Sequence, residues 1–447
     1  MPSIIEALDA VDPEGLERWV VAQRWFGAKA REVNIEVRHA IPLTDDPDLA
    51  VVIVAARTHA GTHELYQLLV GIDENGLVLD ALGEPERARR FVEMLRDGTQ
   101  VESGPDRVSF RWTGELAPLG DRPEVRSLRA EQSNSSVVID ERVSLKMYRH
   151  IEAGDNPELE LLRFLSEHGY TSIPTLAGWY ELEGDLLDAT LGVAMSYVHG
   201  KDGWDLVLDQ LATDPEDLVV RLGELGGVIG RMHATLASDA MDPDFAPEDP
   251  GDEALSLLTA TIDEEIERVF LDLPDHPSVA PIAGRGQDIR DRLRLMVQIG
   301  NGGRLIRHHG DLHLGQTIMS REGWIVLDFE GEPARPLIER RRKQSPLRDV
   351  AGMLRSFAYA ASASELLRGN RAPDSWEPEA REAFLEGYRE ATDMSLMPSG
   401  QGAMERLLGV FELEKAVYEL RYEIQNRPDW VGIPVAGILR LLDEPLS

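Results

Sequence analysis

The chain has 447 residues, 43% of them hydrophobic, which is enough apolar material for two or three packed domains and excludes a disordered or fibrous protein. Its 80 acidic and 46 basic residues give a formal net charge of -34, which disfavours a general nucleic-acid binder or a protein of anionic membrane surfaces. Cysteine is absent, which excludes a disulfide framework, a thiolate nucleophile and a thiolate metal site.

The front of the chain predicts a small α+β unit. Residues 14–26 have helical periodicity, and residues 51–59 and 63–73 alternate as strands do. Trp25 and Phe26 are expected to anchor the core of this unit. The first residues lack the basic segment and apolar core of a secretory signal, and no apolar run approaches a membrane span, so we expect a cytoplasmic protein without membrane or nucleic-acid partners.

Residues 126–149 predict two strands around a polar turn that includes Gln132 to Ser136. Small hydroxyl and amide residues in a turn can direct several N–H donors at a phosphate, although an ordinary hairpin turn fits the same residues. Lys146 lies between apolar residues in the second strand, and Glu158 or Glu160 on the next helix can supply its counter-charge. Kinase-like folds place an ammonium group against ATP phosphates in this way, whereas many edge-strand lysines are merely solvated.

The helix after this strand is predicted to begin at Asn156 and Pro157, a good N-cap and first-turn pair. Two further strand-like stretches follow, and the sequence then becomes mostly helical. Long helices are predicted at 216–238, 254–271 and 404–425, and a loop rich in Pro and Asp at 239–253.

The stretch HGDLHLGQTIMSREGWIVLD, residues 309–328, has the residue types that phosphoryl transfer needs. Asp311 follows a His-Gly turn and can take the proton of an attacking hydroxyl, while Gln316 and Asp328 offer the oxygen ligands that Mg²⁺ prefers. A helix-capping Asp311 and a salt-bridged Asp328 are the alternative. The histidines at 308, 309 and 313 have no spacing that puts them on one face, so structural roles are favoured over a zinc site.

These motifs resemble the aminoglycoside-phosphotransferase-like branch of the kinase fold, and within it the maltokinase-like family of bacterial sugar kinases. The similarity covers nearly the whole chain and starts from HGDLH with Gln316 and from Asp328-Phe329-Glu330. It also includes QRWFG at 23–27, EQSNSS at 131–136, Asn156-Pro157 with Glu160, GEP at 331–333, ERR at 339–341, SPLRDVAG at 345–352, the Tyr-Glu pairs at 418–419 and 422–423, and NRPDW at 426–430.

The resemblance implies an α+β, bilobal, eukaryotic-protein-kinase-like fold with ATP between the lobes. An N-terminal cap would occupy residues 1–100, a β-rich N-lobe 101–198 and a helical C-lobe 199–447. Asp311 would be the catalytic base, Gln316 and Asp328 would hold Mg²⁺ with Glu330 as a helper, and Lys146 would form its ion pair with Glu160. The ATP site would further comprise the loop residues Ser133, Asn134, Ser135 and Ser136 and the hinge residues Met195, Ser196, Tyr197 and Val198.

The C-terminal helix carries the residues that bear on the acceptor. Glu419 and Glu423 are like charges at i, i+4, whose repulsion sugar hydroxyls, an ammonium group, Arg421 or Arg427 can offset. A solvated helix face is the alternative, and it suits Glu419 better than Glu423. Trp430 offers a flat apolar surface for a pyranose ring.

The resemblance implies a basic residue in maltokinases where this chain has Gln425. Loss of that charge near paired carboxylates favours a protonated amine in the pocket, unless Gln425 is a neutral surface substitution. The family that the chain resembles also includes glucosamine kinases, and the resemblance therefore implies a glucosamine kinase that uses ATP and Mg²⁺ to make glucosamine 6-phosphate. Maltose 1-phosphorylation is the first alternative and aminoglycoside phosphorylation the second. The predicted substrate site comprises Asp311, His313, Tyr418, Glu419, Tyr422, Glu423, Gln425 and Trp430.

Overall fold

The computed structural model describes residues 4–27, 33–58, 63–72, 78–117, 119–128, 133–251, 254–271, 273–274, 276–297, 302–333 and 335–443. The chain divides into a smaller unit (Met1–Ser166, Pro174–Val198 and Pro333–Leu337) and a larger unit (Glu167–Ile173, His199–Glu332 and Ile338–Ser447). The smaller unit contains both the predicted cap and the predicted N-lobe, so the boundary at residue 100 stays a prediction. Among the described helices, none is both long and apolar enough to cross a membrane.

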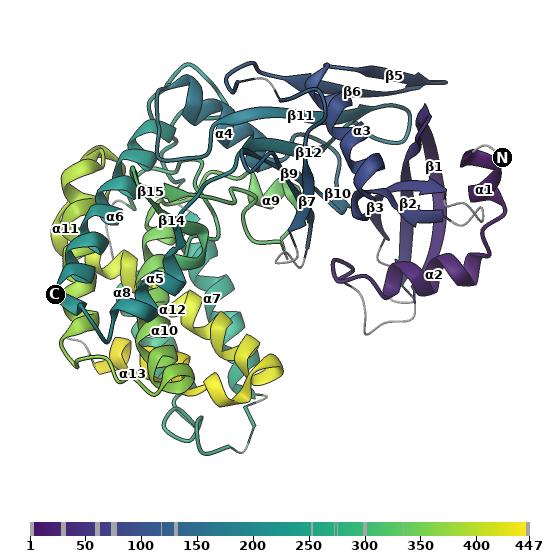
Figure 1. The fold of residues 1–447 in the computed structure, drawn as a ribbon. Coiled ribbons are helices and arrows are strands. Elements are labelled where there is room, and N and C mark those ends of the chain that lie inside the picture. The colour runs from purple at the N-terminus through teal and green to yellow at the C-terminus, as the bar shows by residue number, and fades with distance from the viewer. Residues whose placement is uncertain are drawn as a thin grey trace. The chain divides into compact units, whose positions relative to one another are not determined.

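The first sheet of the smaller unit is built on three long antiparallel strands, β1 (Val33–Asp45), β2 (Asp48–Thr58) and β3 (His63–Ile72). The short strands β4 (Val78–Asp80) and β10 (His150–Ile151) both pair with β3. Helices α1 (Ile4–Asp9) and α2 (Pro13–Val21) pack against this sheet (Figure 1) and share a core with Trp25 and Phe26, as predicted. Even-numbered residues of β2 from Ala50 to Ala56 belong to that core, and odd-numbered residues from Leu49 to Ile53 belong to a second one. Since successive side chains of a strand point to opposite faces, burial of both faces explains why β2 is almost entirely apolar.

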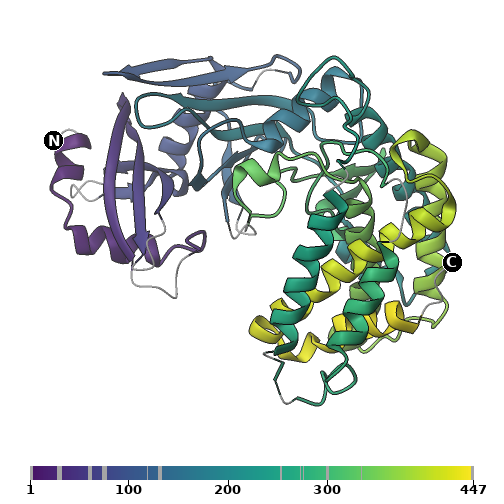
Figure 2. The same ribbon diagram turned by 180° about the vertical axis from the view of Figure 1, so that it is seen from behind.

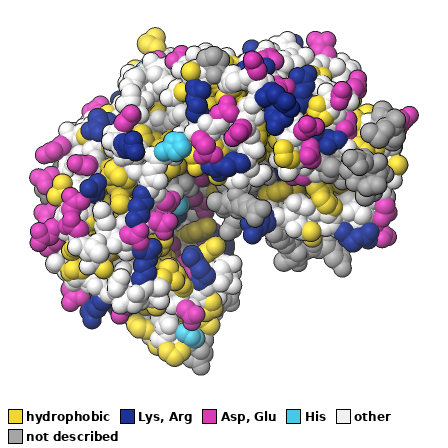
Figure 3. All heavy atoms as spheres, viewed as in Figure 1, with side chains coloured by type: hydrophobic (Ala, Val, Ile, Leu, Met, Phe, Trp, Pro, Cys, Tyr) yellow, Lys and Arg dark blue, Asp and Glu magenta, His cyan; other side chains and the backbone are white. Residues whose placement is uncertain are grey.

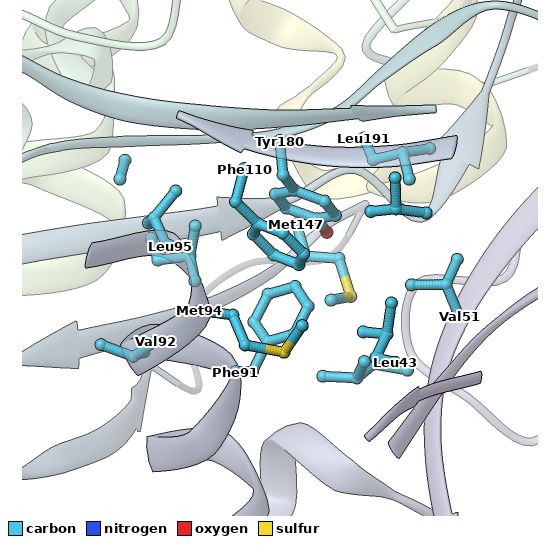
Figure 4. Packing of buried hydrophobic residues seen from close by; sticks show 14 of the residues in the cluster. Leu43, Val51, Phe91, Val92, Met94, Leu95, Phe110, Met147, Tyr180 and Leu191 are labelled. Atoms are coloured by element: carbon cyan, nitrogen blue, oxygen red, sulfur yellow. The ribbon is translucent and has the colours of Figure 1, made fainter. Parts of the chain in front are cut away.

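The second sheet of the smaller unit has seven antiparallel strands in the order β5-β6-β11-β12-β9-β8-β7. Phe91 of α3 (Pro85–Arg96) contacts the rings of Phe110 and Tyr180, at centroid distances of 5.2 and 5.0 Å. Leu43 and Val51 of the first sheet belong to the same core (Figure 4), so this cluster joins the two sheets. The strands are β5 (Gln100–Ser103), β6 (Asp106–Trp112), β7 (Val125–Leu128), β8 (Ser135–Ile139), β9 (Val143–Met147), β11 (Leu176–Glu183) and β12 (Ala189–Ser196).

Helix α4 (Pro157–Glu167) begins where the sequence predicted it. The backbone N–H of Glu158 donates a hydrogen bond of 2.9 Å to the side chain of Asn156, which confirms Asn156 as the N-cap.

The larger unit is mainly helical, and the three long helices predicted from periodicity are confirmed as α6, α7 and α12. A three-stranded sheet of β13 (Lys201–Asp202), β14 (Thr317–Ser320) and β15 (Gly323–Val326) carries the segment with the two candidate aspartates. The helices are α5 (Gly203–Gln210), α6 (Pro215–Leu236), α7 (Ala254–Leu271), α8 (Gly286–Met296), α9 (Leu337–Arg340), α10 (Leu347–Arg368), α11 (Trp376–Ala391), α12 (Gln401–Asn426) and α13 (Gly432–Asp443), and the short 3-10 helices of the chain are η1 (Ala81–Gly83), η2 (Leu314–Gln316), η3 (Met394–Leu396) and η4 (Pro428–Trp430).

Helix α12 lies at the centre of the helical packing and contacts α7, α8, α10 and α13 (Figure 2). Helices α6 and α11 approach each other unusually closely. A Cβ atom at Gly226 of α6 would lie 2.0 Å from the carbonyl oxygen of Phe384 on α11, so this crossing tolerates no side chain there.

The exposed side of α11 carries Glu379, Glu382, Glu386 and Glu390, along an edge where acidic side chains gather (Figure 3). This face holds part of the chain's excess negative charge.

Candidate active site

The turn before Asp311 is fixed by a glycine and a histidine. Gly310 has a φ of +86°, a conformation that residues with a Cβ atom rarely adopt. His309 accepts a hydrogen bond from the backbone N–H of Asp311 through Nδ1 (3.3 Å), so its proton is on Nε2, which lies 2.8 Å from the carbonyl oxygen of Leu327. His309 therefore ties the turn at Asp311 to the residue just before Asp328.

Gln316 and Asp328 lie side by side. The Gln316 amide donates to Asp328 Oδ2 at 2.9 Å, and the backbone carbonyl of Gln316 accepts from the N–H of Leu327 at 2.9 Å. Asp328 has a φ of +62°, a costly backbone conformation that is concentrated at functional sites. An amide oxygen and a carboxylate from neighbouring positions fit the oxygen ligands that Mg²⁺ prefers. Glu330 lies nearby with its carboxylate 3.9 Å from the guanidinium of Arg340.

A buried aspartate on α10 holds the same turn. Asp349 is 2% exposed and accepts hydrogen bonds from the backbone N–H groups of His309 (2.8 Å) and Gly310 (2.9 Å). Its carboxylate also contacts Nε2 of His233 at 3.0 Å, and Nδ1 of His233 contacts the Tyr388 hydroxyl at 2.9 Å. Burial opposes ionisation of Asp349, but the surrounding histidines outweigh it and hold the pKa of this carboxyl well below its usual range. The charged form is thus the one that anchors the turn.

Two charged pairs lie in the predicted acceptor region, one between α10 and α12 and one at the C-terminal end of α12. Arg355 donates to one oxygen of Glu419 at 3.0 and 2.7 Å, and the Glu419 side chain is only 11% exposed. The solvated position considered for Glu419 is therefore wrong. Arg427, one of the partners considered for the two glutamates, donates to Glu423 at 2.8 Å, whereas Arg421 forms an ion pair with Glu265 instead.

Glu423 is buried and incompletely paired. Its Oε1 accepts from Arg427 and from the Tyr359 hydroxyl (3.3 Å), but Oε2 has no hydrogen-bond partner among the described residues. Burial raises the pKa of Glu423, and the two hydrogen bonds offset only part of that rise. The Trp430 ring stacks beside Tyr359 at a centroid distance of 6.4 Å, so an aromatic wall lies close to this carboxylate.

The remaining predicted acceptor residues have different surroundings. Burial and a hydrogen bond to Glu332 raise the pKa of Tyr418. His313 accepts from the N–H of Gly315 through Nδ1 (3.1 Å), and burial lowers its pKa, so it is neutral with its proton on Nε2. Tyr422 is exposed, with the Arg427 guanidinium 5.3 Å above its ring, and Gln425 is exposed at the end of α12.

A cation that was not among the predicted site residues also lies in this region. The ammonium group of Lys415 on α12 lies 3.3 Å from Asp311 Oδ1. Lys415, Glu419 and Glu423 repeat every four residues, so one face of the helix carries all three. Their spacing could therefore have placed Lys415 in the predicted acceptor site together with the two glutamates.

In the smaller unit, the counter-charge of Lys146 is Glu158, and the assignment of Glu160 is wrong. Lys146 Nζ lies 3.0 Å from Glu158 Oε2, which also accepts from the Tyr148 hydroxyl at 2.9 Å. Two residues along a helix correspond to a rotation of about 200°, so only one of the two glutamates can face the sheet. Glu158 is buried, whereas Glu160 is half-buried.

Part of the predicted phosphate loop is strand. Ser135 and Ser136 are the first residues of β8, and Ser136 is paired with Lys146 on β9. Only Ser133 and Asn134 lie in the bend, and Gln132 lies outside the described residues. The edge of the bend is tied to the first sheet by Arg149, which donates to Ser135 Oγ (2.8 Å) and to Asp80 (2.6 Å).

Met195 and Ser196 of the predicted hinge end β12, and Tyr197 and Val198 follow it. Met195 is buried, and the next three residues are half-buried. The N–H of Ser196 donates to the carbonyl of Thr175 (2.8 Å), and that of Tyr197 donates to Arg142 (2.7 Å). These two N–H groups are already hydrogen-bonded within the protein. A nucleotide base bound at this segment would therefore have to hydrogen-bond to other groups.

Comparison with known proteins gives matches along most of the chain. The model described as "Phosphotransferase enzyme family" matches residues 124–391, and that of the "Maltokinase N-terminal cap domain" matches residues 19–94. A glucosamine kinase from Streptacidiphilus jiangxiensis is 26% identical over 410 residues, which are 83% of this chain and 90% of the relative. A glucosamine kinase from Mycolicibacterium smegmatis is 25% identical over 348 residues, which are 75% of this chain and 83% of the relative.

Among solved structures, a glucosamine kinase in complex with glucosamine, ADP and inorganic phosphate matches with a TM-score of 0.73 and 21% identity, covering 99% of each chain. This similarity confirms the predicted kinase-like fold with an N-terminal cap, a β-rich N-lobe and a helical C-terminal region.

Proposed function

The chain belongs to the phosphotransferase enzyme family, and on that premise we propose that it is an ATP-dependent sugar kinase that phosphorylates glucosamine on its 6-hydroxyl group. Two relatives that match most of the chain are glucosamine kinases. The observation that carries the choice of sugar is the buried Oε2 of Glu423, which has no partner among the described residues.

In the proposed reaction, Asp311 takes the proton of the acceptor hydroxyl, whose oxygen attacks the γ-phosphorus of ATP. Asp349 and His309 hold the backbone at Asp311. Gln316 and Asp328 would hold Mg²⁺, which would neutralise charge on the phosphates when bound. Lys146, kept in place by Glu158, would contact the donor phosphates.

A protonated amine supplies what Glu423 lacks. A buried carboxylate with a raised pKa and a vacant oxygen gains a charge-assisted hydrogen bond of roughly 1.5–3 kcal/mol from an ammonium group. A neutral hydroxyl at the same place gives a weaker bond, and among the described residues Arg427 then remains the cation paired with the Glu423 carboxylate. The unpaired oxygen of Glu423 therefore favours an amino sugar over glucose.

The 6-hydroxyl is favoured because Lys415 lies beside Asp311. Two like charges about 4 Å apart repel by about 4 kcal/mol at an effective dielectric constant of about 20. The 1- and 3-hydroxyls of glucosamine neighbour the amine, so either of them at Asp311 would bring the amine toward Lys415. The 6-hydroxyl is on the far side of the ring, which lets the amine reach toward Glu423 instead.

Maltokinase activity is the second candidate, because residues 19–94 match the maltokinase cap. A neutral disaccharide phosphorylated at its 1-hydroxyl would leave Glu423 Oε2 without a charged partner, which weighs against maltose.

The experiment measures ADP release by the purified protein with glucosamine, glucose, maltose and kanamycin, and identifies the phosphorylated carbon by NMR. We expect kcat/KM to be highest for glucosamine and the product to be glucosamine 6-phosphate. A higher kcat/KM for maltose or kanamycin would refute the amino-sugar assignment.

Glu423→Gln tests the recognition of the amine. The loss of one charge-assisted bond lowers kcat/KM for glucosamine by about 10- to 100-fold and leaves glucose within about threefold. Glu405→Gln, an exposed glutamate on the same helix, is the matched control and should change neither value. Equal losses for both sugars would contradict the role of Glu423.

A further inference from the structure

We propose that Lys415 is a further catalytic residue, whose ammonium group binds the transferring phosphoryl group while Asp311 takes the proton of the acceptor hydroxyl. The inference rests on the proposed kinase reaction at Asp311 but not on the identity of the sugar. It starts from the ion pair of 3.3 Å between Lys415 Nζ and Asp311 Oδ1.

Lys415 is a cation that faces the candidate base from another element of the described structure. The catalytic segment has no Lys or Arg between Arg307 and Arg321, and His313, two residues after Asp311, is neutral. Helix α12 supplies the missing charge, since Lys415 is on its face toward Asp311 and its ammonium also lies 5.3 Å from the centroid of the Tyr418 ring.

The surroundings keep Lys415 charged and directed at Asp311. Burial opposes its charge, but Asp311, Glu419 and Glu332 outweigh burial and raise the pKa of Lys415. Glu419, one turn further along α12, already accepts two hydrogen bonds from the buried Arg355. Asp311 is thus the carboxylate to which Lys415 donates its hydrogen bond.

Proton transfer changes the partner of this ammonium group. As the acceptor oxygen bonds to the γ-phosphorus, its proton moves to Asp311 and the bond from phosphorus to the bridging oxygen of ADP breaks. Asp311 becomes neutral, so Lys415 loses its counter-charge while the transferred group carries negative charge on three oxygens. A base about 3 Å from the hydroxyl, and a hydroxyl oxygen about 3–3.5 Å from phosphorus, bring those oxygens within reach of the flexible lysine side chain.

A purely orienting role predicts something different. If Lys415 only positions the Asp311 carboxylate, a neutral hydrogen-bond donor of similar length can replace it. If it stabilises charge in the transition state, only a cation can. Glutamine and arginine at this position separate the two cases.

The test compares Lys415→Gln and Lys415→Arg with the unaltered protein in steady-state kinetics at saturating ATP. We expect Lys415→Gln to lower kcat about 10²- to 10³-fold with KM for the sugar changed less than about threefold, and Lys415→Arg to recover at least about tenfold of that loss. Thermal unfolding verifies that each variant folds. Lys343→Met is the matched control, because Lys343 is equally an ion-paired lysine of the larger unit, 2.7 Å from Glu248, and should keep its kcat.

Chemical rescue by an added amine is a second measurement, and a purely orienting role of Lys415 predicts no rescue. Methylammonium added to Lys415→Ala should raise kcat with saturation, and methylammonium added to Lys343→Met should not. A Lys415→Gln enzyme with kcat within threefold of the parent, or a loss confined to KM, overturns the proposal.

The outcomes also separate this inference from the choice of sugar. If maltose is the preferred acceptor and Lys415→Gln still loses kcat, the glucosamine assignment fails and the role of Lys415 stands. If glucosamine is preferred and Lys415→Gln is fully active, the reverse holds. A parent protein inactive on every acceptor overturns both.

Discussion

Replacing Asp349 by Asn tests whether this residue holds the catalytic turn. The carboxylate accepts from two backbone N–H groups, at 2.8 and 2.9 Å, and contacts His233 at 3.0 Å, while only 2% exposed. An Asn side chain has one acceptor oxygen, so its NH₂ group must face one of these donors. Losing a charge-assisted bond costs roughly 1.5–3 kcal/mol and stranding a buried donor roughly 1–3 kcal/mol. We expect a loss of about 3–5 kcal/mol in the free energy of unfolding.

The same change should also affect turnover, because the N–H groups concerned belong to the two residues before Asp311. A displacement of the base by about 1 Å can cost about 100-fold in rate. Urea unfolding and kcat for the preferred sugar measure the two effects. Asp374→Asn, whose exposed carboxylate pairs with Arg371 at 3.0 Å, is the control and should cost less than about 1 kcal/mol. An Asp349→Asn variant within 1 kcal/mol and threefold in kcat of the parent would falsify the anchoring role.

Two further predictions concern packing and pH. Gly226→Ala should destabilise the protein by about 1–3 kcal/mol, because the new Cβ would lie 2.0 Å from the carbonyl oxygen of Phe384. Gly227→Ala is the control and should be neutral or stabilising, because the nearest atom to its Cβ lies at 3.4 Å; equal thermal midpoints for the two variants would contradict the close crossing of α6 and α11. Burial lowers the pKa of His308 from 6.5 to about 4, so the unfolded chain binds more protons between these values and stability falls as pH drops through this window. His308→Gln should remove about 3 kcal/mol of the difference in unfolding free energy between pH 7 and pH 4, and an unchanged difference in urea titrations would rule this out.

Much of the fold could be predicted from the sequence, because the signals for helices and caps come from residues close together in the chain. The N-cap at Asn156 and the periodicity of α6, α7 and α12 each depend on residues within a few turns of one another. The same holds for the proximity of Gln316 and Asp328, which one hairpin brings together.

Side-chain contacts between segments far apart in the sequence could not be predicted from such local signals. His233, Asp349 and Tyr388 come from three helices, and no spacing connects them before the helices pack. Arg355 and Tyr359 are likewise four residues apart on α10, but their pairing with Glu419 and Glu423 depends on the direction in which α10 crosses α12.

The sequence by itself determined the chemistry on offer: a base after a His-Gly turn, an amide and a carboxylate for a metal ion, and a strand lysine that needs a counter-charge. The tertiary structure decided which charges meet. It paired Lys146 with Glu158 rather than Glu160, placed Lys415 beside Asp311, and left one buried oxygen of Glu423 without a partner among the described residues. The reason is that residue type and spacing fix what a segment can form, whereas the partner of a buried charge depends on which face another element covers.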